Sequence, residues 1–343
     1  MNYDEIITTP YTVLEALSES EIYDIVSTLI EHYRKIGFPY FEIDKDKIKK
    51  ECLSLSKSDS SKIELPNNEL QQGMLGLATC NMFHQEMYAV NCKNAKSPMD
   101  IFLDDGLFRT ALTKRIKYND RNLNPSCVRR TLSAFGGQAA SNFRPSIARW
   151  VYQKYAPIGG SVLDPCMGYG GRLMGAFCSQ VRRYVATDPN KVSIAGNINL
   201  HNHLFEARPD RPVFELSTSA LPFEDFVTDE KFDLVFTSPP YFNVEKYAAD
   251  EKQSYARYPT YEKWVEGFLT PLINHSFDYL KPNGYLVLNV GKPIDEDTYR
   301  IGTKVFGKEP ETYHMRLSKF LGQGNKKDVS HKVEPIFVWK KTT

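Results

Sequence analysis

Hydrophobic and polar positions follow two different patterns along this chain, and the change comes near residue 140. Before it, apolar residues recur at helical spacing, and in 16–36 one helix face would carry Leu17, Ile22, Ile25, Val26, Leu29, Ile30 and Tyr33. Residues 44–55 predict a second, charge-rich helix, and the Ser- and Asp-rich residues 56–68 predict a loop. Residues 122–137, with one proline and two glycines, predict a domain boundary or an ordered connector.

After residue 140, short apolar runs alternate with segments of helical pattern. The predicted strands are 160–164, 183–188, 213–216, 232–237 and 285–290, and the predicted helices are 145–155, 172–179, 191–205 and 264–280. This alternation favours a parallel sheet covered on both faces, a doubly wound α/β fold. Residues 313–316 and 334–340 predict an antiparallel hairpin at the sheet edge. We therefore expect a largely helical N-terminal region, 1–140, and an α/β domain, 141–343.

The composition is that of an ordinary globular protein, with 343 residues, 41% hydrophobic and 25% charged residues, and a formal net charge of +1. The start of the chain, Met1 to Glu5, has no signal pattern, and no apolar stretch approaches the ~20 residues that a membrane span needs. A cytoplasmic protein is the expectation. The six cysteines form no CxxC pair, so we expect neither a metal site nor a disulfide framework.

Residues 106–150 depart from this even charge balance. They hold a single acid, Asp120, against nine bases: Arg109, Lys114, Arg115, Lys117, Arg121, Arg129, Arg130, Arg144 and Arg149. Such a segment suits a phosphate backbone, although a solvated helical face is the alternative interpretation. We expect phosphate or guanine contacts from Lys117, Arg129 and Arg130.

The most informative motif is Ser238-Pro239-Pro240-Tyr241, which directly follows the apolar run 232–237. Two prolines cannot continue a central strand, so the backbone must leave the sheet as a stiff turn. The turn would present a hydroxyl, free carbonyl groups and one aromatic face. A planar ring with an exocyclic amine needs these groups, because its amine hydrogens need acceptors and the ring needs a stacking face. The alternative interpretation is a rigid strand exit without a ligand.

A second motif, Asp164-Pro-Cys-Met-Gly-Tyr-Gly-Gly171, follows the first predicted strand. Its glycines let the backbone bend tightly near a ligand, at the strand end where doubly wound sheets bind nucleotides. Asp188 ends the next predicted strand, where a carboxylate can accept hydrogen bonds from both ribose hydroxyls. An acid before the glycines repels a pyrophosphate but suits a cationic ligand. We therefore expect S-adenosylmethionine, which carries an ammonium and a sulfonium.

Together these motifs resemble the amino-group DNA methyltransferases, which modify adenine N6 or cytosine N4 and carry D-P-x-x-G-x-G followed by [D/N/S]-P-P-[Y/F]. The resemblance begins at Asn142 and runs to the C-terminus, and the layout is similar to phage- or mobile-element-borne methylases. It implies the Rossmann-like fold of class I S-adenosylmethionine-dependent methyltransferases. It also implies cofactor contacts from Phe143, Arg144, Pro145, Asp164, Pro165, Cys166, Met167, Gly168, Gly170, Asp188, Pro189, Ser219 and Ala220.

This sequence departs from the family pattern at two places in the glycine motif. Cys166 stands where an aromatic residue is common, and Gly171-Arg172 replaces the usual Thr-rich continuation. Both departures concern the way in which the methionine end of the cofactor is held.

By the mechanism of that family, Ser238 and the carbonyl of Pro239 would accept the two amine hydrogens, Pro240 would stiffen the turn and Tyr241 would stack on the base. Methyl transfer would be a direct in-line displacement that depends on positioning and electrostatics. The target base must be flipped out, because its amine is unreachable inside a duplex. A serine in the first position leans towards cytosine N4, whereas Asp or Asn leans towards adenine.

Double-stranded DNA is the expected partner, and a cognate restriction nuclease is left open. Recognition would come from the N-terminal 140 residues and the basic segment. Tyr247 belongs to the Tyr-rich residues 242–261, which predict either a loop over the flipped base or local packing. Two alternatives remain: an RNA or protein-glutamine methyltransferase, and an inactive methylase-like DNA-binding subunit of a defence complex.

Overall fold

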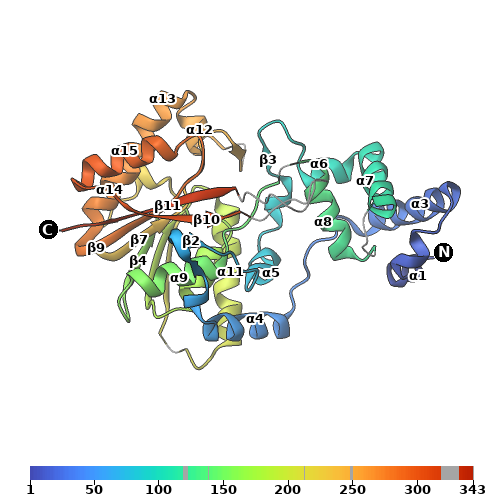
Figure 1. Ribbon diagram of the computed structural model, residues 1–343, viewed down its shortest axis with the longest axis horizontal. Coiled ribbons are helices and arrows are strands. Elements are labelled where there is room, and N and C mark those ends of the chain that lie inside the picture. The colour runs from blue at the N-terminus through green and yellow to red at the C-terminus, as the bar shows by residue number, and fades with distance from the viewer. Residues whose placement is uncertain (119–122, 138, 212, 248–249, 318–331, 343) are drawn as a thin grey trace. The chain divides into compact units, whose positions relative to one another are not determined.

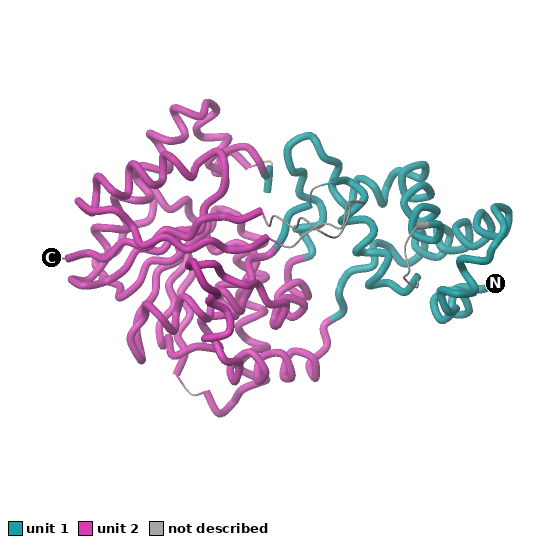
Figure 2. Tube along the Cα trace, viewed as in Figure 1, with its two compact units in different colours: residues 1–42, 85–141, 245–247 teal, residues 43–84, 142–244, 248–343 magenta. Residues whose placement is uncertain are grey.

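The computed structural model describes residues 1–118, 123–137, 139–211, 213–247, 250–317 and 332–342. The chain divides into two compact units, drawn in Figure 2. The first contains residues 1–42, 85–141 and 245–247, and the second contains 43–84, 142–244 and 248–343. This division corrects the predicted boundary at residue 140, because 43–84 pack with the α/β domain: α4 (Lys45–Lys57) lies against α11 (Lys191–Ala207).

The second unit is built on a nine-stranded sheet in the order β1-β2-β10-β11-β9-β7-β4-β5-β6. Its strands are β1 (Glu64–Leu65), β2 (Glu69–Leu70), β4 (Ser161–Asp164), β5 (Arg183–Thr187), β6 (Glu215–Ser219), β7 (Phe232–Thr237), β9 (Leu280–Asn289), β10 (Glu311–Arg316) and β11 (Val333–Lys340). The five central strands from β9 to β6 run parallel, and β10 and β11 form the predicted antiparallel hairpin. The doubly wound, mostly parallel Rossmann-like fold is thereby confirmed.

Helices cover both faces of this sheet. Besides α4 and α11 they are α5 (Leu77–Met82), α9 (Pro145–Tyr155), α10 (Gly171–Phe177), α12 (Ser254–Arg257), α13 (Tyr261–Trp264), α14 (Thr270–Tyr279) and α15 (Asp295–Phe306), with a π-helical turn at Val265–Leu269 and 3₁₀ turns at Ser60–Lys62, Pro66–Asn68 and Phe223–Asp225. In Figure 1, α14 and α15 lie along one face and α9 and α11 along the other.

Strand β7 shows why both faces must be covered. The ring of Phe236 lies 5.4 Å from that of Tyr152 on α9, whereas Val235 belongs to the core cluster that contains Trp264 and Leu288. Because successive strand residues face opposite sides, an unbroken apolar run is buried only between two helical layers. The carboxyl ends of the parallel strands meet at one edge, where the two predicted motifs leave the sheet.

The first unit is mainly helical. Its elements are α1 (Tyr3–Thr8), α2 (Tyr11–Leu14), α3 (Glu19–Ile36), α6 (Pro98–Leu103), α7 (Asp105–Tyr118), α8 (Pro125–Phe135), a 3₁₀ turn at Gln85–Ala89, and the short strand pair β3 (Asn91–Cys92) and β8 (Glu245–Lys246). A capping box of Ser18 and Glu21 starts α3, whose predicted apolar face is buried. Among the described residues, no helix is long and apolar enough to cross a membrane.

Candidate active site

The glycine turn, Asp164 to Gly171, is held by contacts that only small or backbone groups allow. Gly168 and Gly170 have φ angles of 59° and 83°, in the left-handed region that favours glycine. A Cβ atom at Gly171 would collide with the carbonyl oxygen of Phe143, so the backbone of that predicted cofactor segment runs directly against the turn. Asn197 of α11 donates to the Gly168 carbonyl at 2.8 Å. The backbone of the turn is therefore packed closely against α11 and the segment that contains Phe143.

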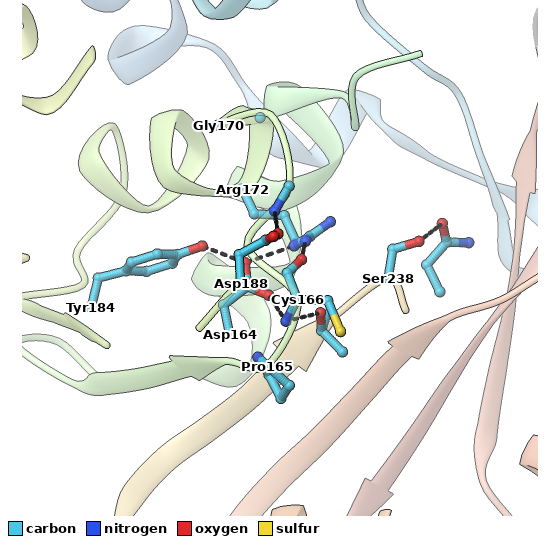
Figure 3. A network of polar contacts seen from close by, with 12 residues as sticks. Asp164, Pro165, Cys166, Gly170, Arg172, Tyr184, Asp188 and Ser238 are labelled. Carbon is cyan, nitrogen blue, oxygen red and sulfur yellow. Dashed lines mark hydrogen bonds and ion pairs between the residues drawn. The ribbon is translucent and has the colours of Figure 1, made fainter. Parts of the chain in front are cut away.

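Asp164, predicted from the sequence to suit a cationic ligand, is bound to neighbouring side chains of the protein. Its side chain is fully buried, and Oδ2 accepts hydrogen bonds from Arg172 Nε at 2.8 Å and Tyr184 Oη at 2.5 Å (Figure 3). Arg172 lies in the first turn of α10 and reaches back to the acid. The departure Gly171-Arg172 thus supplies the counter-ion of Asp164.

Asp188 lies where the prediction places it, just past the end of β5. It is half-buried, and its two oxygens accept backbone N–H groups from Gly168 and Asn190, each at 2.9 Å. Burial raises the pKa of this carboxyl, although the two N–H groups oppose the shift. Each oxygen keeps a further lone pair, so the carboxylate can still accept hydrogen bonds from a ligand. Its own N–H donates to Ser219 at 3.1 Å, which brings the β6 end beside it.

The other predicted cofactor residues line the same sheet edge or support it. Pro165 and Met167 are buried and tied to Thr187, through Thr187 Oγ1 to the Pro165 carbonyl at 2.7 Å and Met167 N to the Thr187 carbonyl at 2.9 Å. Pro189 and Ala220 are half-buried beside Asp188 and Ser219. Pro145 starts α9, and Arg144 donates to Gln72 at 2.9 Å.

The Ser238–Tyr241 turn starts next to the glycine turn. Thr237, the last residue of β7, is fully buried, and its hydroxyl accepts the backbone N–H of Cys166 at 3.1 Å. The side chain of Cys166 is half-buried, and burial raises the pKa of its thiol, to which the charges of Asp188 and Asp164 add. The two predicted motifs are therefore joined by a hydrogen bond between neighbouring strands.

Two residues beside the Ser238–Tyr241 turn were not assigned to the site from the sequence. Ser238 Oγ donates to Asn289 Oδ1 at 3.4 Å, and Tyr241 Oη donates to Glu334 Oε2 at 3.3 Å. Asn289 ends β9 and Glu334 lies near the start of β11. The sequence could place Asn289 at the carboxyl edge of the sheet, but nothing in it indicated that β11, which lies between β10 and β9, supplies an acid.

Glu224 is a further acid near the site that was not assigned from the sequence. Its side chain is buried in the 3₁₀ turn after β6, where it forms an ion pair with Arg257 at 3.2 Å. Burial raises the pKa of its carboxyl. Its charge also contributes to the raised pKa of Cys166, after burial, Asp188 and Asp164. The available signal was its position just past a strand end at the carboxyl edge.

The tyrosines after the Ser238–Tyr241 turn are mostly engaged in packing. A Cβ atom at Gly267 would overlap the ring of Tyr258, and Tyr261 Oη donates to Asp297 at 2.8 Å. Tyr247 belongs to the first compact unit, where its hydroxyl donates to Glu245. Local packing therefore describes Tyr258 and Tyr261.

The predicted DNA contacts differ in their surroundings. Arg129 is buried: it donates to the Pro39 carbonyl at 2.6 Å and its guanidinium lies 3.5 Å over the ring of Phe41, which corrects its assignment as a DNA contact. Lys117 forms an ion pair with Glu19 at 2.7 Å. Arg130 is exposed. Arg121 lies outside the described residues.

No metal site emerges from the described part of the chain, where no three or more His, Cys, Asp or Glu side chains group together as ligands. All six cysteines are free thiols.

Residues 232–343 match a family model described as DNA methylase. The match starts at β7 and includes the Ser238–Tyr241 turn, Asn289 and Glu334. It confirms the predicted resemblance to amino-group DNA methyltransferases over these residues and identifies a methyltransferase region. No curated protein matches the chain.

Solved structures with a similar fold share little sequence with this chain. A putative class I S-adenosylmethionine-dependent methyltransferase from Listeria monocytogenes is 13% identical, covers 87% of this chain and 89% of its own, and has a TM-score of 0.42. The N-methyltransferase NodS from Bradyrhizobium japonicum, in complex with S-adenosyl-L-homocysteine, is 15% identical over 57% of this chain and 85% of its own, with a TM-score of 0.37. A methyltransferase from Pyrococcus furiosus is 16% identical over 58% and 83%, with a TM-score of 0.36.

Proposed function

We propose that this protein is a DNA methyltransferase that transfers a methyl group from S-adenosylmethionine to the exocyclic amine of a flipped base. The observation that carries the proposal is the hydrogen bond between Cys166 N and the hydroxyl of Thr237. It holds the candidate cofactor turn and the Ser238–Tyr241 turn side by side, as direct transfer between two ligands requires. The DNA methylase match over residues 232–343 supports the same reaction class.

The residues around the glycine turn fit S-adenosylmethionine, which when bound supplies an electrophilic methyl group on its sulfonium. Asp188 offers a half-buried carboxylate with free lone pairs for the ribose hydroxyls. Gly168 and Gly170 let the backbone approach the ligand closely. Glu224 adds a buried acceptor beyond β6, at the edge where Ser219 and Ala220 would border the adenine. Asp164 contributes by fixing Arg172 and the turn.

The Ser238–Tyr241 turn would prepare the amine for attack. Ser238 Oγ and the Pro239 carbonyl accept its two N–H groups, which favours a pyramidal nitrogen with a lone pair that faces the methyl group. In such a transfer the nitrogen–carbon bond would form as the carbon–sulfur bond breaks, the electron pair of the broken bond would stay on sulfur, and the methylated amine would lose one proton to water. Tyr241 stacks on the base. No step needs a covalent bond to the enzyme.

Cytosine N4 is the favoured target, because a serine stands in the first position of the motif. The duplex has to be opened and the base flipped to reach the site. We further propose that the N-terminal unit takes part in DNA recognition and that the exposed Arg130, with Lys117 and Tyr247, contributes to DNA contact. A cognate restriction nuclease remains a prediction of the resemblance.

The experiment is mass spectrometry of nucleosides from unmethylated genomic DNA treated with the protein and S-adenosylmethionine. N4-methylcytosine is the expected product. N6-methyladenine would retain the reaction class and correct the base, and the absence of both would contradict the proposal.

Two controls sharpen this experiment. Ser238→Ala and Tyr241→Ala variants should lose the product while they retain binding of S-adenosylhomocysteine, because neither side chain holds the cofactor. Parallel reactions with tRNA and with protein test the RNA and protein-glutamine alternatives. Methyl transfer to tRNA or to protein, without transfer to DNA, would show that DNA is not the substrate.

A further inference from the structure

Asn289 lies at the end of β9 between the Ser238–Tyr241 turn and the neighbouring strand β11. Only 2% of the residue is exposed. Its Nδ2 donates to the Pro335 carbonyl at 3.3 Å, and its Oδ1 accepts the hydroxyl of Ser238 at 3.4 Å. A buried amide that bridges two strands in this way ordinarily stabilises the fold, so a catalytic role needs an additional argument.

The surroundings of Asn289 determine which way its amide points. On the β11 side it faces two acceptors, the carbonyl of Pro335 and the carboxylate of Glu334. An amide oxygen turned towards these groups would face two acceptors and like charge, whereas the NH₂ group can donate to both. The NH₂ group must therefore point towards β11, and Oδ1 must point towards Ser238.

This orientation fixes the hydroxyl of Ser238. An amide oxygen cannot donate, so the single hydroxyl proton of Ser238 is given to Asn289. The remaining lone pairs of Ser238 Oγ are then free to accept. An exocyclic amine presents N–H donors, and a hydroxyl that rotated its own proton towards such an amine would oppose it.

We propose that Asn289 is a positioning residue that holds the hydroxyl of Ser238 as a hydrogen-bond acceptor for the amine of the target base. This inference rests on the proposed function and adds to it a chain that runs from β11 through Asn289 to Ser238. Asn289 itself touches neither base nor cofactor in this role. It acts by preventing the hydroxyl of Ser238 from turning its proton towards the amine of the substrate.

Glu334 connects this chain to the second side chain of the turn. The same carboxylate accepts the phenol of Tyr241 at 3.3 Å. Gly291, two residues past Asn289, makes room for both, because a Cβ atom there would lie 2.8 Å from Tyr241 Cε2 and 3.1 Å from Glu334 Oε1. The acceptor that orients Asn289 is therefore itself fixed in place.

A double-mutant cycle separates this role from simple support of the strands. Initial methylation rates of unmethylated genomic DNA are measured at saturating S-adenosylmethionine for Ser238→Ala, Asn289→Ala and the double variant. We expect losses in kcat on the order of 10²-fold for Ser238→Ala and about tenfold for Asn289→Ala. In the Ser238→Ala background, Asn289→Ala should cost less than about twofold, because no hydroxyl is left to orient.

Affinity for S-adenosylhomocysteine and thermal melting are measured for every variant, and the exposed Asn199→Ala on α11 is the control for an amide loss elsewhere in the unit. If Asn289→Ala unfolds, the cycle is repeated with Asn289→Leu, which keeps the branching of the side chain and removes its hydrogen bonds. Losses that multiply in the double variant would overturn the inference and leave the proposed function standing. A wild-type protein that methylates no DNA would overturn the proposed function and this inference together.

Discussion

The backbone N–H of Cys166 donates to the buried hydroxyl of Thr237 at 3.1 Å, across the neighbouring strands β4 and β7. These residues stand at the starts of the two turns that carry the candidate chemistry. Both turns leave the sheet at the same edge, and this contact continues the pairing of β4 with β7 beyond the ends of the two strands. Because direct transfer depends on the approach of two ligands, the distance between the turns should matter more for rate than for binding.

Thr237→Val tests this relationship, because it removes the hydroxyl and keeps the shape. We expect a loss of about 1 kcal/mol in the free energy of unfolding, since Cys166 N would keep its longer bond to Asp164 Oδ1 at 3.3 Å. Affinity for S-adenosylhomocysteine should change little, because Thr187 also anchors the glycine turn. The methylation rate should fall roughly tenfold. Thr218→Val on β6 is the matched control, and an unchanged rate for Thr237→Val would refute the spacing argument.

Substitution of Asp164 by Asn should mainly lower stability, whereas the same substitution of Asp188 should mainly weaken cofactor binding. Asp164→Asn leaves the buried charge of Arg172 without its partner, so the free energy of unfolding should fall by about 3–5 kcal/mol. Asp188→Asn should cost about 1 kcal/mol in stability but weaken binding of S-adenosylhomocysteine roughly 10- to 100-fold, through the loss of charge-assisted hydrogen bonds. Urea unfolding and calorimetry measure the two effects. Equal stability losses would contradict the division of roles.

The sequence predicted the fold well where the spacing of apolar residues agrees with the residues that mark the ends of an element. Helix 145–155 and strand 232–237 match α9 and β7, because each has a consistent apolar period and a proline that marks its boundary. The region 122–137 was wrongly predicted as a connector, since it contains α8. Asn124 caps this helix and Pro125 occupies its first turn, a start signal that the nearby glycines obscured.

The parts of the candidate site that lie within local sequence motifs were predicted, and the parts that depend on distant residues were not. Both turns and Asp188 were placed correctly at one sheet edge, because parallel strands end together. The contacts of Asp164 with Arg172 and Tyr184 were not predicted, because a carboxylate at a strand end is equally suited to a ligand and to a buried arginine. Glu334 lies 93 residues from Tyr241, and pairing over such a separation is set by the sheet order, which no local pattern encodes.

Gly291→Ala should disturb Tyr241 without an effect on the cofactor. The added Cβ atom would stand 2.8 Å from Cε2 of the ring, so Tyr241 must shift from its position against Glu334. We expect the methylation rate to fall roughly tenfold or more with unchanged binding of S-adenosylhomocysteine. Gly106→Ala on α7 is the control, because its Cβ atom would lie 3.4 Å from Asp104 Oδ1, an ordinary contact distance. A variant with full activity would remove Tyr241 from the proposed mechanism.

Glu224→Gln should change stability in a way that depends on pH. Burial raises the pKa of Glu224 above its ordinary value of 4.5, so the folded state resists ionisation of this carboxyl. Below pH 4.5 the carboxyl is protonated in the folded and in the unfolded protein, so its burial does not lower the stability of the wild type. As the pH rises towards neutrality, the carboxyl ionises first in the unfolded protein, and the free energy of unfolding of the wild type falls. Arg257 keeps its bonds to Asp225 in the variant. The melting temperature of Glu224→Gln relative to wild type should therefore rise from pH 4.5 to neutral pH, and a constant difference would refute this assignment.

Arg129 and Arg130 are adjacent in sequence and should separate stability from DNA binding. Arg130 is exposed, so Arg130→Ala should weaken DNA binding and lower the slope of log affinity against log salt by about 1, as the loss of one phosphate contact does. Arg129→Ala should instead lower the melting temperature, because it removes a buried guanidinium bound to the Pro39 carbonyl. Fluorescence anisotropy over a salt series and thermal melting measure both, with the exposed Arg182→Ala as control. An unchanged salt slope in Arg130→Ala would remove this residue from the DNA contacts, whatever the reaction at the sheet edge.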